Sequence, residues 1–444
     1  MGPGAGGVAL SVWPVRASVP TPVSFRASEA SRRIALVPAE GSLYRVLAAA
    51  CVAALLTLGV AGCHAGTSAA DAESVARIPA RLADSAFWRL MRDFSEPGGT
   101  FRSENLVSNE TSLQYVLPEL VARVPAGGVY VGVAPDQNFT YVAALRPAIA
   151  FVVDIRHQNA MELLMYKALI EASRDRAEFL AMLFGRAPLA GVDTTSSAEQ
   201  LFEALDRQPP DSARYRANVA AILDRLTRVH RFALSDSERT LVACVYGAFF
   251  AQGPSLTYGY STDCRGDGGS HGYGRFGLGG RGRPGMPTYF GMLAETDGAG
   301  RNWSYLGSER AFRAVKAMEE RNLIVPLTGD FAGPKALRSI GEWTRAHDAT
   351  IRIFYVSNVE QYLWEDGDAA KRFYTTLSAW PLDSSSTFIQ SFGAFRISPD
   401  PELLSRPHSP RDRSYNVVNP MQPVLEAFRA GKLTSWEDVL RMSK

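Results

Sequence analysis

The sequence predicts an α/β fold built on a doubly wound, mostly parallel sheet, with a helical insertion between its second and third strands. Three observations support this prediction. Apolar runs of strand length alternate with segments of helical periodicity, the pattern of a parallel sheet covered by helices on both faces. Polar or acidic residues follow each of these runs. A long helical stretch separates the second run from the third.

The composition is that of a globular protein with nearly balanced charge. The chain has 444 residues, of which 46% are hydrophobic and 21% charged, and its formal net charge is +2. This length allows one large domain or two modest ones. The nearly neutral balance gives no electrostatic reason to expect nucleic acid as a partner.

Residues 1–63 read as an N-terminal extension followed by an export signal. Arg32, Arg33 and Arg45 precede an uncharged apolar run over residues 46–62, which is the arrangement of a secretory signal. The run ends in VAGC, which resembles the lipobox of bacterial lipoproteins, and this resemblance implies lipidation of Cys63. A transmembrane anchor or a buried helix is the alternative, although the run is short for a span. We therefore expect an exported protein, lipid-anchored on the periplasmic side of the cell envelope, with a cytoplasmic location as the alternative.

Residues 64–80 are predicted to be a tether, and residues 81–158 the first part of the sheet domain. Helices are expected over Leu82–Phe94 and Thr111–Arg123. The stretch from Gly127 to Asn159 reads as strand, turn, helix and strand, because the apolar runs VYVGV and AIAFVVD flank the segment QNFTYVAAL.

Residues 159–285 are predicted to be a helical insertion that ends in a glycine-rich loop. MELLMYKALIEAS places its apolar residues at helical spacing. Ser196 and Ser235 each precede a glutamate by three positions, which fits a capping box and predicts helices starting near 197 and 236. The glycine-dense segment 265–285 cannot form a packed element.

Residues 286–444 are predicted to complete the sheet and to form the C-terminal region. The apolar run Leu323–Leu327 reads as the third strand, and Thr350–Val356 as the fourth. The helix between them is expected to begin at Pro334, because proline is favoured at the first helical position. A further run near 386–392 is expected to add a last strand at one edge.

Polar residues follow four of the predicted strands. Carboxyl ends of parallel strands share one edge of a sheet, and doubly wound folds bind their ligands there. Asp154 follows Gly132 by 22 positions, near the ~20 expected between a phosphate-type turn and a ribose-binding acid. The third and fourth strands are followed by Gly329-Asp330 and Ser357-Asn358.

This order of features resembles that of class I S-adenosylmethionine-dependent methyltransferases. In that family the first turn approaches the methionine part of the cofactor, the next acid holds the ribose hydroxyls, and an aspartate after the third strand reaches the adenine amine. The resemblance implies a Rossmann-like fold, S-adenosylmethionine as the cofactor, and methyl transfer to an unidentified acceptor. It implies that the cofactor-binding residues are Gly132, Asp136, Gln137, Asn138, Asp154, Arg156, Gly329, Asp330, Ser357 and Asn358, with Asp154 on the ribose and Asp330 on the adenine.

The chain also resembles a family of uncharacterised bacterial proteins, predicted lipoproteins, that share the motifs GVxPxQNFTY, VDIRxQN, GDFAGPKA and SNVEQYL. This second resemblance supports a membrane partner through the lipid anchor, and it implies no activity.

The first turn departs from the methyltransferase pattern. Only Gly132 remains of the expected glycines, and Pro135 removes a backbone donor, so the usual backbone contacts to the cofactor are not expected. Asp154 and Asp330 also suit the capping of a helix. S-adenosylmethionine is a cytosolic metabolite, which conflicts with export. The alternative function is therefore a non-catalytic envelope lipoprotein that uses a degenerate methyltransferase fold to bind a ligand or a protein. In either case the expected ligand is a small molecule or a nucleotide-like compound, which could differ from S-adenosylmethionine.

Other chemistries find little support. Gly268–Gly272 fits G-x-S-x-G, but a nucleophile elbow needs a strand before it and a helix after it. The histidines are scattered and no metal-ligand spacing occurs, so no metal is expected. Cys244 and Cys264 either pair in an oxidising compartment or remain free thiols.

Overall fold

The structure is a computed structural model, and it describes residues 77–101, 105–259, 264, 285–393, 401–409 and 414–443. The predicted signal, Cys63, most of the tether and the glycine-rich segment lie outside the described residues. Among the residues it does describe, no helix has both the length and the apolar character needed to cross a bilayer.

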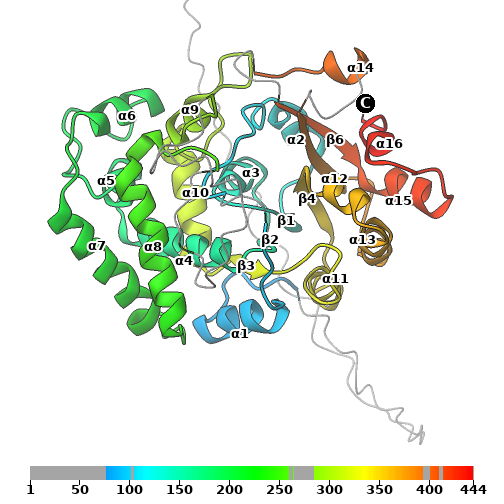
Figure 1. The fold of residues 1–444 in the computed structure, drawn as a ribbon, viewed down its shortest axis with the longest axis horizontal. Coiled ribbons are helices and arrows are strands. Elements are labelled where there is room, and N and C mark those ends of the chain that lie inside the picture. The colour runs from blue at the N-terminus through cyan, green and yellow to red at the C-terminus, as the bar shows by residue number, and fades with distance from the viewer. Residues whose placement is uncertain are drawn as a thin grey trace, which may run out of the picture. The chain divides into compact units, whose positions relative to one another are not determined.

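A six-stranded sheet in the order β3-β2-β1-β4-β5-β6 forms the centre of the molecule (Figure 1). Strands β1 to β5 are parallel, and β6 runs antiparallel to β5. The predicted α/β fold with a mostly parallel sheet is therefore confirmed. The strands are β1 (Val129–Gly132), β2 (Ile149–Asp154), β3 (Ile324–Thr328), β4 (Ile351–Ser357), β5 (Thr387–Gly393) and β6 (Ser414–Pro420).

Two sets of packed helices cover the sheet. The first set is α2 (Leu117–Arg123), α3 (Gln137–Leu145), α4 (His157–Ala172) and α10 (Glu309–Glu319). The second is α1 (Asp84–Phe94), α11 (Ala336–Ala346), α12 (Val359–Glu365), α13 (Ala369–Leu377), α14 (Pro401–Leu404), α15 (Met421–Arg429) and α16 (Trp436–Leu440). Apart from α14, each helix contacts at least one other helix of its set, and α1, α4, α12 and α15 also contact strands of the sheet. Leu403 of α14 lies in a buried cluster with residues of β5, β6 and α16. This cover explains why every residue of β1 and β2 is buried.

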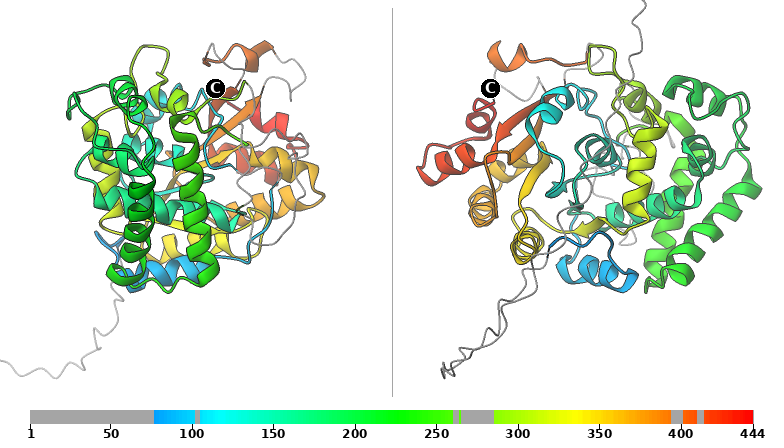
Figure 2. Two further views of the ribbon diagram at one scale, coloured as in Figure 1. Left: turned by 60° about the vertical axis from the view of Figure 1, so that its left-hand side comes forward. Right: turned by 180° about the vertical axis from the view of Figure 1, so that it is seen from behind.

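The predicted helical insertion between β2 and β3 is present. Figures 1 and 2 show its helices gathered at the end of the molecule opposite α15 and α16. They are α5 (Arg176–Leu183), α6 (Ala198–Asp206), α7 (Ser212–Asp224), the π-helix Arg225–Val229, α8 (Asp236–Gln252), the 3-10 helix Gly253–Ser255 and α9 (Tyr289–Ala294). Helix α4 lies between this group and the sheet, in contact with both α8 and β3.

One hydrophobic core runs through the sheet and the insertion. Phe151 of β2, Tyr166 of α4 and Phe249 of α8 belong to the same buried cluster. The rings of Tyr166 and Phe249 meet edge to face, with centroids 5.7 Å apart. The insertion therefore packs as a part of the domain that carries the sheet.

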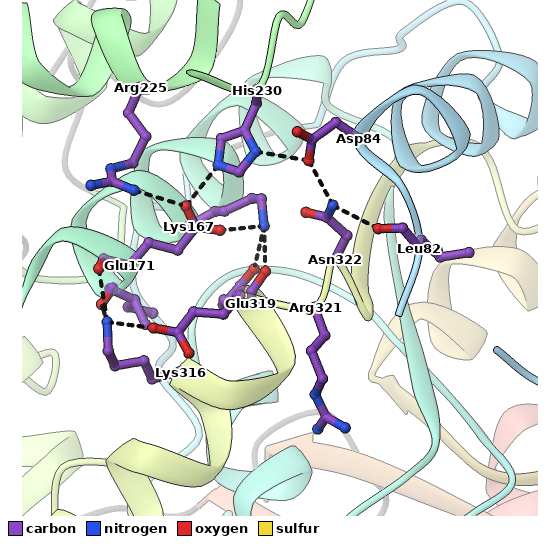
Figure 3. A network of polar contacts seen from close by, with 12 residues as sticks. Leu82, Asp84, Lys167, Glu171, Arg225, His230, Lys316, Glu319, Arg321 and Asn322 are labelled. Carbon is purple, nitrogen blue, oxygen red and sulfur yellow. Dashed lines mark hydrogen bonds and ion pairs between the residues drawn. The ribbon is translucent and has the colours of Figure 1, made fainter. Parts of the chain in front are cut away.

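A buried ionic network also joins the insertion to the sheet domain (Figure 3). The His230 imidazole, which follows the π-helix, lies 2.9 Å from the Asp84 carboxylate of α1 and 2.7 Å from the Glu171 carboxylate of α4. Lys167 donates to Glu171 at 2.7 Å and to the backbone carbonyl of Glu319 in α10. Four segments that are distant in sequence thus meet around the side chains of Lys167 and His230.

Some element boundaries differ from the predictions. The helix expected over 111–123 begins only at Leu117, and the helix expected at Pro334 begins at Ala336. The first capping box uses Ser197 with Gln200, one residue beyond the predicted Ser196. The second uses Ser235 with Glu238, as predicted.

The prediction of 386–392 as an edge strand is wrong, because β5 pairs with β4 on one side and with β6 on the other. Strand β6, SYNVVNP, was not predicted. Asparagine and proline are depleted in strands, and the sequence of β6 contains both.

Cys244 of α8 and Cys264 form a disulfide. The structure thus resolves the two alternatives left open by the sequence. Disulfides of this kind persist in oxidising compartments.

Candidate functional site

The strand order brings the predicted site residues to one edge of the sheet. Asp330 follows β3, Asp154 ends β2, Asp136 follows β1 and Ser357 ends β4. These four strands are consecutive neighbours in the sheet, and all four are parallel, so the residues lie along their common carboxyl edge. We call this region the carboxyl edge.

The turn after β1 is held together by its own side chains. The Asn138 amide nitrogen donates to the carbonyls of Val133, Ala134 and Pro135 at 2.8, 3.0 and 2.7 Å. The Asn138 oxygen accepts from the Tyr130 hydroxyl at 2.8 Å. The side chain of Asn138 therefore shapes the turn, and all of its polar atoms have partners within the protein.

Gly132 leaves the space that Asn138 fills. A Cβ atom at Gly132 would lie 1.9 Å from the Asn138 Oδ1 atom and 2.7 Å from the Tyr130 hydroxyl. The methyltransferase resemblance assigns Gly132 to cofactor binding. In this fold a glycine is also needed at position 132 because the Asn138 and Tyr130 side chains occupy the space of a Cβ atom.

Two non-glycine residues of the carboxyl edge adopt left-handed backbone conformations. Ala134, after β1, has φ = 67°, and Ser357, at the end of β4, has φ = 54°. Such conformations cost free energy in L-residues and concentrate at functional sites. They fall here at the ends of two adjacent strands, which supports a site at this edge.

Asp154 and Arg156 form a buried ion pair. Arg156 donates from Nε and Nη2 to the two Asp154 carboxylate oxygens at 3.1 and 2.8 Å, and its backbone amide adds a third bond at 2.8 Å. Burial lowers the pKa of the Arg156 guanidinium, but Asp154 outweighs burial and raises it. The Arg156 Nη1 atom has no partner among the described residues.

A segment ahead of the sheet covers the ends of β3 and β2. Glu96 accepts from the backbone amides of Asp330, Lys335 and Ala336 at 3.2, 2.8 and 2.8 Å. The amide of Gly99 donates to the carbonyl of Ile155 at 2.7 Å. We call residues 95–99 the strap.

The loop that contains Gly329 and Asp330 is closely packed beneath the strap. A Cβ atom at Gly329 would lie 2.4 Å from the Ala336 Cβ atom. The Asp330 carboxylate accepts a hydrogen bond from the Ala332 amide at 2.8 Å. In this structure it therefore stabilises the turn of the loop that contains it.

The buried carboxyl group of Glu110, which lies ahead of α2, contacts the end of β4. Ser357 donates to Glu110, and Asn416 of β6 donates to the other Glu110 oxygen at 2.8 Å. Burial raises the pKa of Glu110, although these donors oppose the increase. Asn358 is half-buried, and its oxygen lies 3.4 Å from the Ser357 hydroxyl.

Gln137 joins the ends of β1 and β4. Its amide nitrogen donates to the Tyr355 hydroxyl at 3.1 Å. Its side-chain oxygen is buried and has no partner among the described residues. Buried polar atoms nearly always have a partner, so this oxygen can accept a hydrogen bond from a group placed beside it.

A small hollow lies beside Asp136 and Gln137. It encloses about 10 Å³, room for about one water molecule. The Tyr305 hydroxyl donates to the Asp136 carboxylate at 3.3 Å, and Tyr305 lies 2.7 Å from the Tyr289 hydroxyl of the insertion. Burial raises the pKa of Asp136 to about 7.

Two residues of α4 belong to the same polar region. The polar stretch after β2, which includes Asn159, was predicted to favour a site, whereas Glu162 was not predicted from the sequence. Asn159 and Glu162 are fully buried, and none of their side-chain oxygen and nitrogen atoms has a partner among the described residues. Burial, with the nearby charges of Asp136 and Asp154, raises the pKa of Glu162 well above its ordinary value, and Arg156 opposes this. In the sequence, the feature that could have indicated Glu162 as a site residue is its position inside the otherwise apolar run MELLMY.

The carboxyl edge is rich in hydrogen-bonding groups but tightly closed. Besides the 10 Å³ hollow, the described residues enclose a larger hollow of about 410 Å³ lined by Pro420, Val424 and Arg441. Pro420 pairs with Thr387 at the beginning of β5, so this second hollow lies at the opposite end of the strands. No group of three metal-binding side chains occurs in the part of the chain that is described.

Comparison with known proteins gives one family match. The profile of a domain of unknown function (DUF7790) matches residues 105–243 and 280–419, which is more than half of the chain. The matched ranges contain all the predicted cofactor-binding residues. A search of the curated proteins finds no match.

Proposed function

Because the chain belongs to the family described as a domain of unknown function (DUF7790), we propose its function from the residues of the site. The proposed function is that of a methyltransferase-like protein, which binds S-adenosylmethionine at the carboxyl edge and transfers its methyl group to an acceptor. The observation that carries this proposal is the strand order 3-2-1-4-5 followed by an antiparallel strand. It aligns Asp330, Asp154, Asp136 and Ser357 at the edge where doubly wound folds bind ligands.

The residues present fit the cofactor in chemical type. Asp154 and Asp330 are carboxylates of the kind that bind ribose and adenine. Gln137, Asn159 and Glu162 have buried polar atoms that find no partner in the described part of the chain. When bound, S-adenosylmethionine would supply an activated methyl group, and the protein would act mainly by positioning the acceptor.

The carboxyl edge has too little free space for S-adenosylmethionine unless the protein changes conformation. The Asp154 carboxylate is already paired with Arg156, and the hollow beside Asp136 holds about 10 Å³. Binding therefore requires Arg156 to release Asp154 and the strap to move from the end of β3. Arg156 then serves as an internal substitute for the ligand's hydroxyl groups in the unbound protein.

A second candidate function is a non-catalytic envelope lipoprotein that binds a ligand or a protein. The Asp154–Arg156 pair favours it, because the residue assigned to ribose is neutralised by the chain itself. The Cys244–Cys264 disulfide also favours it, since disulfides persist outside the reducing cytosol. In this case export and a lipid on Cys63 remove the protein from cytosolic S-adenosylmethionine.

Thermal melting with S-adenosylmethionine tests the first proposal. A ligand at a hundredfold its dissociation constant stabilises the folded protein by ~2.7 kcal/mol. We expect this shift in the wild type and in Asp93→Asn, an exposed acid of α1, and its loss in Asp154→Asn. Ligand-induced shifts are compared within each variant, because Asp154→Asn also changes the starting stability.

Two results would decide between the candidates. An unchanged wild-type melting temperature at saturating S-adenosylmethionine would reject the cofactor proposal. A mature N-terminus that carries lipid at Cys63, found by mass analysis of the fractionated envelope, would support the second candidate.

A further inference from the structure

The strap lies across the ends of β3 and β2. The Glu96 amide donates to the carbonyl of Thr328, the last residue of β3, at 2.8 Å. The Gly99 amide donates to the carbonyl of Ile155, the residue after β2, at 2.7 Å. The strap therefore bridges the loop after β3 and the turn after β2, the two places to which the adenine and ribose contacts are assigned.

The Glu96 side chain fastens the strap to the loop after β3. Three backbone amides of this loop converge on its carboxylate, those of Asp330, Lys335 and Ala336, at 3.2, 2.8 and 2.8 Å. Gly333 leaves room for this contact, because a Cβ atom at that position would overlap with the Glu96 carboxylate. Hydrogen bonds to an ionised acceptor are roughly twice as strong as those between neutral groups. We call this contact the latch.

The remaining contacts of the strap are also polar. The Thr328 amide donates to the Ser95 hydroxyl at 3.0 Å, and the Lys335 ammonium group donates to the Ser95 carbonyl at 3.1 Å. The last three residues of the strap are exposed, and the segment contributes no side chain to the buried apolar core. Segments held by solvent-facing hydrogen bonds, with few buried apolar contacts, open locally at a lower free energy than the whole fold. The strap can therefore open while the core stays folded.

Aromatic contacts hold the chain on either side of the strap. Before it, the Phe94 ring stacks on Phe151 of β2, with centroids 6.2 Å apart. After it, the Phe101 ring meets the Tyr362 ring of α12 edge to face, with centroids 5.2 Å apart. These contacts keep both ends of the segment attached when its centre moves.

We infer that the strap is a lid over the carboxyl edge, and that the Glu96 carboxylate is the latch that keeps it closed. Opening frees the loop after β3 and the turn after β2 together, because the strap is bonded to both. Only the open fraction of the molecules admits a ligand, so closure lowers the apparent affinity of the site in proportion. The role of the lid in ligand entry rests on the proposed function, whereas its opening does not.

Hydrogen exchange of the full chain without ligand tests the opening. Six amides are bonded to the strap or belong to it, those of Glu96, Gly99, Thr328, Asp330, Lys335 and Ala336. We expect them to exchange together, about a hundredfold faster than the amides of β2. Urea below the unfolding transition should leave their rates unchanged, because local opening exposes little surface. Exchange of these amides only on global unfolding would overturn the inference.

Two substitutions on opposite sides of the latch should open the strap. Glu96→Gln replaces one carboxylate oxygen by a donor that faces a backbone donor, and Gly333→Ala places a methyl group where the carboxylate lies. Each should raise the exchange rate of the Gly99 amide about tenfold, since the bonds to the ionised acceptor are lost. The double variant should add little, because both changes break the same contact.

The Gly99 amide is the decisive reporter. Neither substitution alters its bond to the Ile155 carbonyl, so its rate rises only if the strap opens as a unit. An unchanged Gly99 rate in both variants would show that Glu96 is a local contact of its loop and would reject the latch.

Glu342→Gln is the matched control. Glu342 is an exposed acid of α11, and the variant removes the same charge from the same region. All six amides should keep their wild-type rates in this variant.

Calorimetric titration with S-adenosylmethionine separates the lid from the cofactor proposal. Glu96→Gln should bind about tenfold more tightly than the wild type, because a larger fraction of the molecules is open. Equal affinity in the two proteins would reject the lid and leave the cofactor proposal intact. Absence of binding in both, together with the expected exchange rates, would reject the cofactor proposal and support the lid.

Discussion

At the scale of single residues, the turn after β1 shows how a position assigned to a ligand can also serve the fold. The sequence predicted a turn at Gly132 because a strand ended there. It could not predict that Asn138 would fold back on the turn, since its three acceptors are backbone carbonyls that only the folded turn brings together.

Gly132→Ala should destabilise the protein by about 3 kcal/mol, at the upper end of the cost of overpacking. The added methyl would lie 1.9 Å from Asn138 Oδ1, and Asn138 cannot move without breaking its bonds to the turn. Urea unfolding monitored by circular dichroism measures the change. A loss below about 1 kcal/mol would show that Asn138 can be displaced at little cost.

Ala134→Gly is the matched substitution in the same turn, and it should change the free energy of unfolding in the opposite direction. Ala134 has φ = 67°, a conformation that costs an L-residue roughly 1–2 kcal/mol. Glycine removes this strain but adds flexibility to the unfolded chain, so the free energy of unfolding should rise by up to about 1 kcal/mol in the same assay. A clear decrease would mean that the Ala134 methyl contributes packing that outweighs the strain.

At the scale of elements, the sequence predicted those whose apolar pattern matches their environment. β1, α3 and β2 were recognised because apolar runs flank a helical segment, and the structure confirms them. β6 was missed because Asn416 and Asn419 do not resemble strand residues. In the fold their amides bond the buried side chains of Glu110 and Gln390. The same limit applies to Glu162, because its charged neighbours Asp136 and Asp154 lie on other segments of the chain and only the fold brings them close.

The network in Figure 3 makes the attachment of the insertion depend on pH. Burial lowers the pKa of His230, but its hydrogen bonds to Glu171 and Asp84 outweigh burial and raise it above 6.5. A raised pKa stabilises the fold fully below pH 6.5 and loses this contribution as the pH rises through the folded-state value. The free energy of unfolding should therefore fall from pH 6.5 upward.

Urea unfolding of wild type and His230→Gln at several pH values tests this dependence. The variant should be less stable at pH 6 and should lack the fall above pH 6.5. His347→Gln, at the end of α11, should keep the wild-type slope. On the acid side, burial opposes the shift, but His230 and Lys167 lower the pKa of Glu171 to about 2. The contribution of Glu171 to stability is therefore complete above pH 4.5 and is lost progressively as the pH falls from 4.5 to about 2. A parallel profile in His230→Gln and wild type would contradict the role of His230.

At the scale of the whole molecule, the continuous core implies that the sheet and the insertion unfold together. Phe151, Tyr166 and Phe249 share one buried cluster. We expect a single calorimetric transition whose van't Hoff enthalpy equals the calorimetric enthalpy. Two resolved transitions, or early loss of α8 in hydrogen exchange, would show that the insertion is a separate folding unit.

The disulfide closes a loop of 20 residues between Cys244 and Cys264. Replacing both cysteines by serine should lower the free energy of unfolding by about 2–4 kcal/mol. Unfolding in urea without reductant measures this loss. Equal stability of the double variant and the oxidised wild type would show that the bond adds nothing to the fold.

The strap sets the length of chain that must be expressed to obtain this protein. The family match begins at residue 105, but Glu96 accepts from three backbone amides of the loop after β3, and α1 packs against β3 and α11. A fragment trimmed to the matched ranges would lack both, and would leave those amides facing solvent. Recombinant preparations for crystallisation or screening should therefore start no later than residue 77.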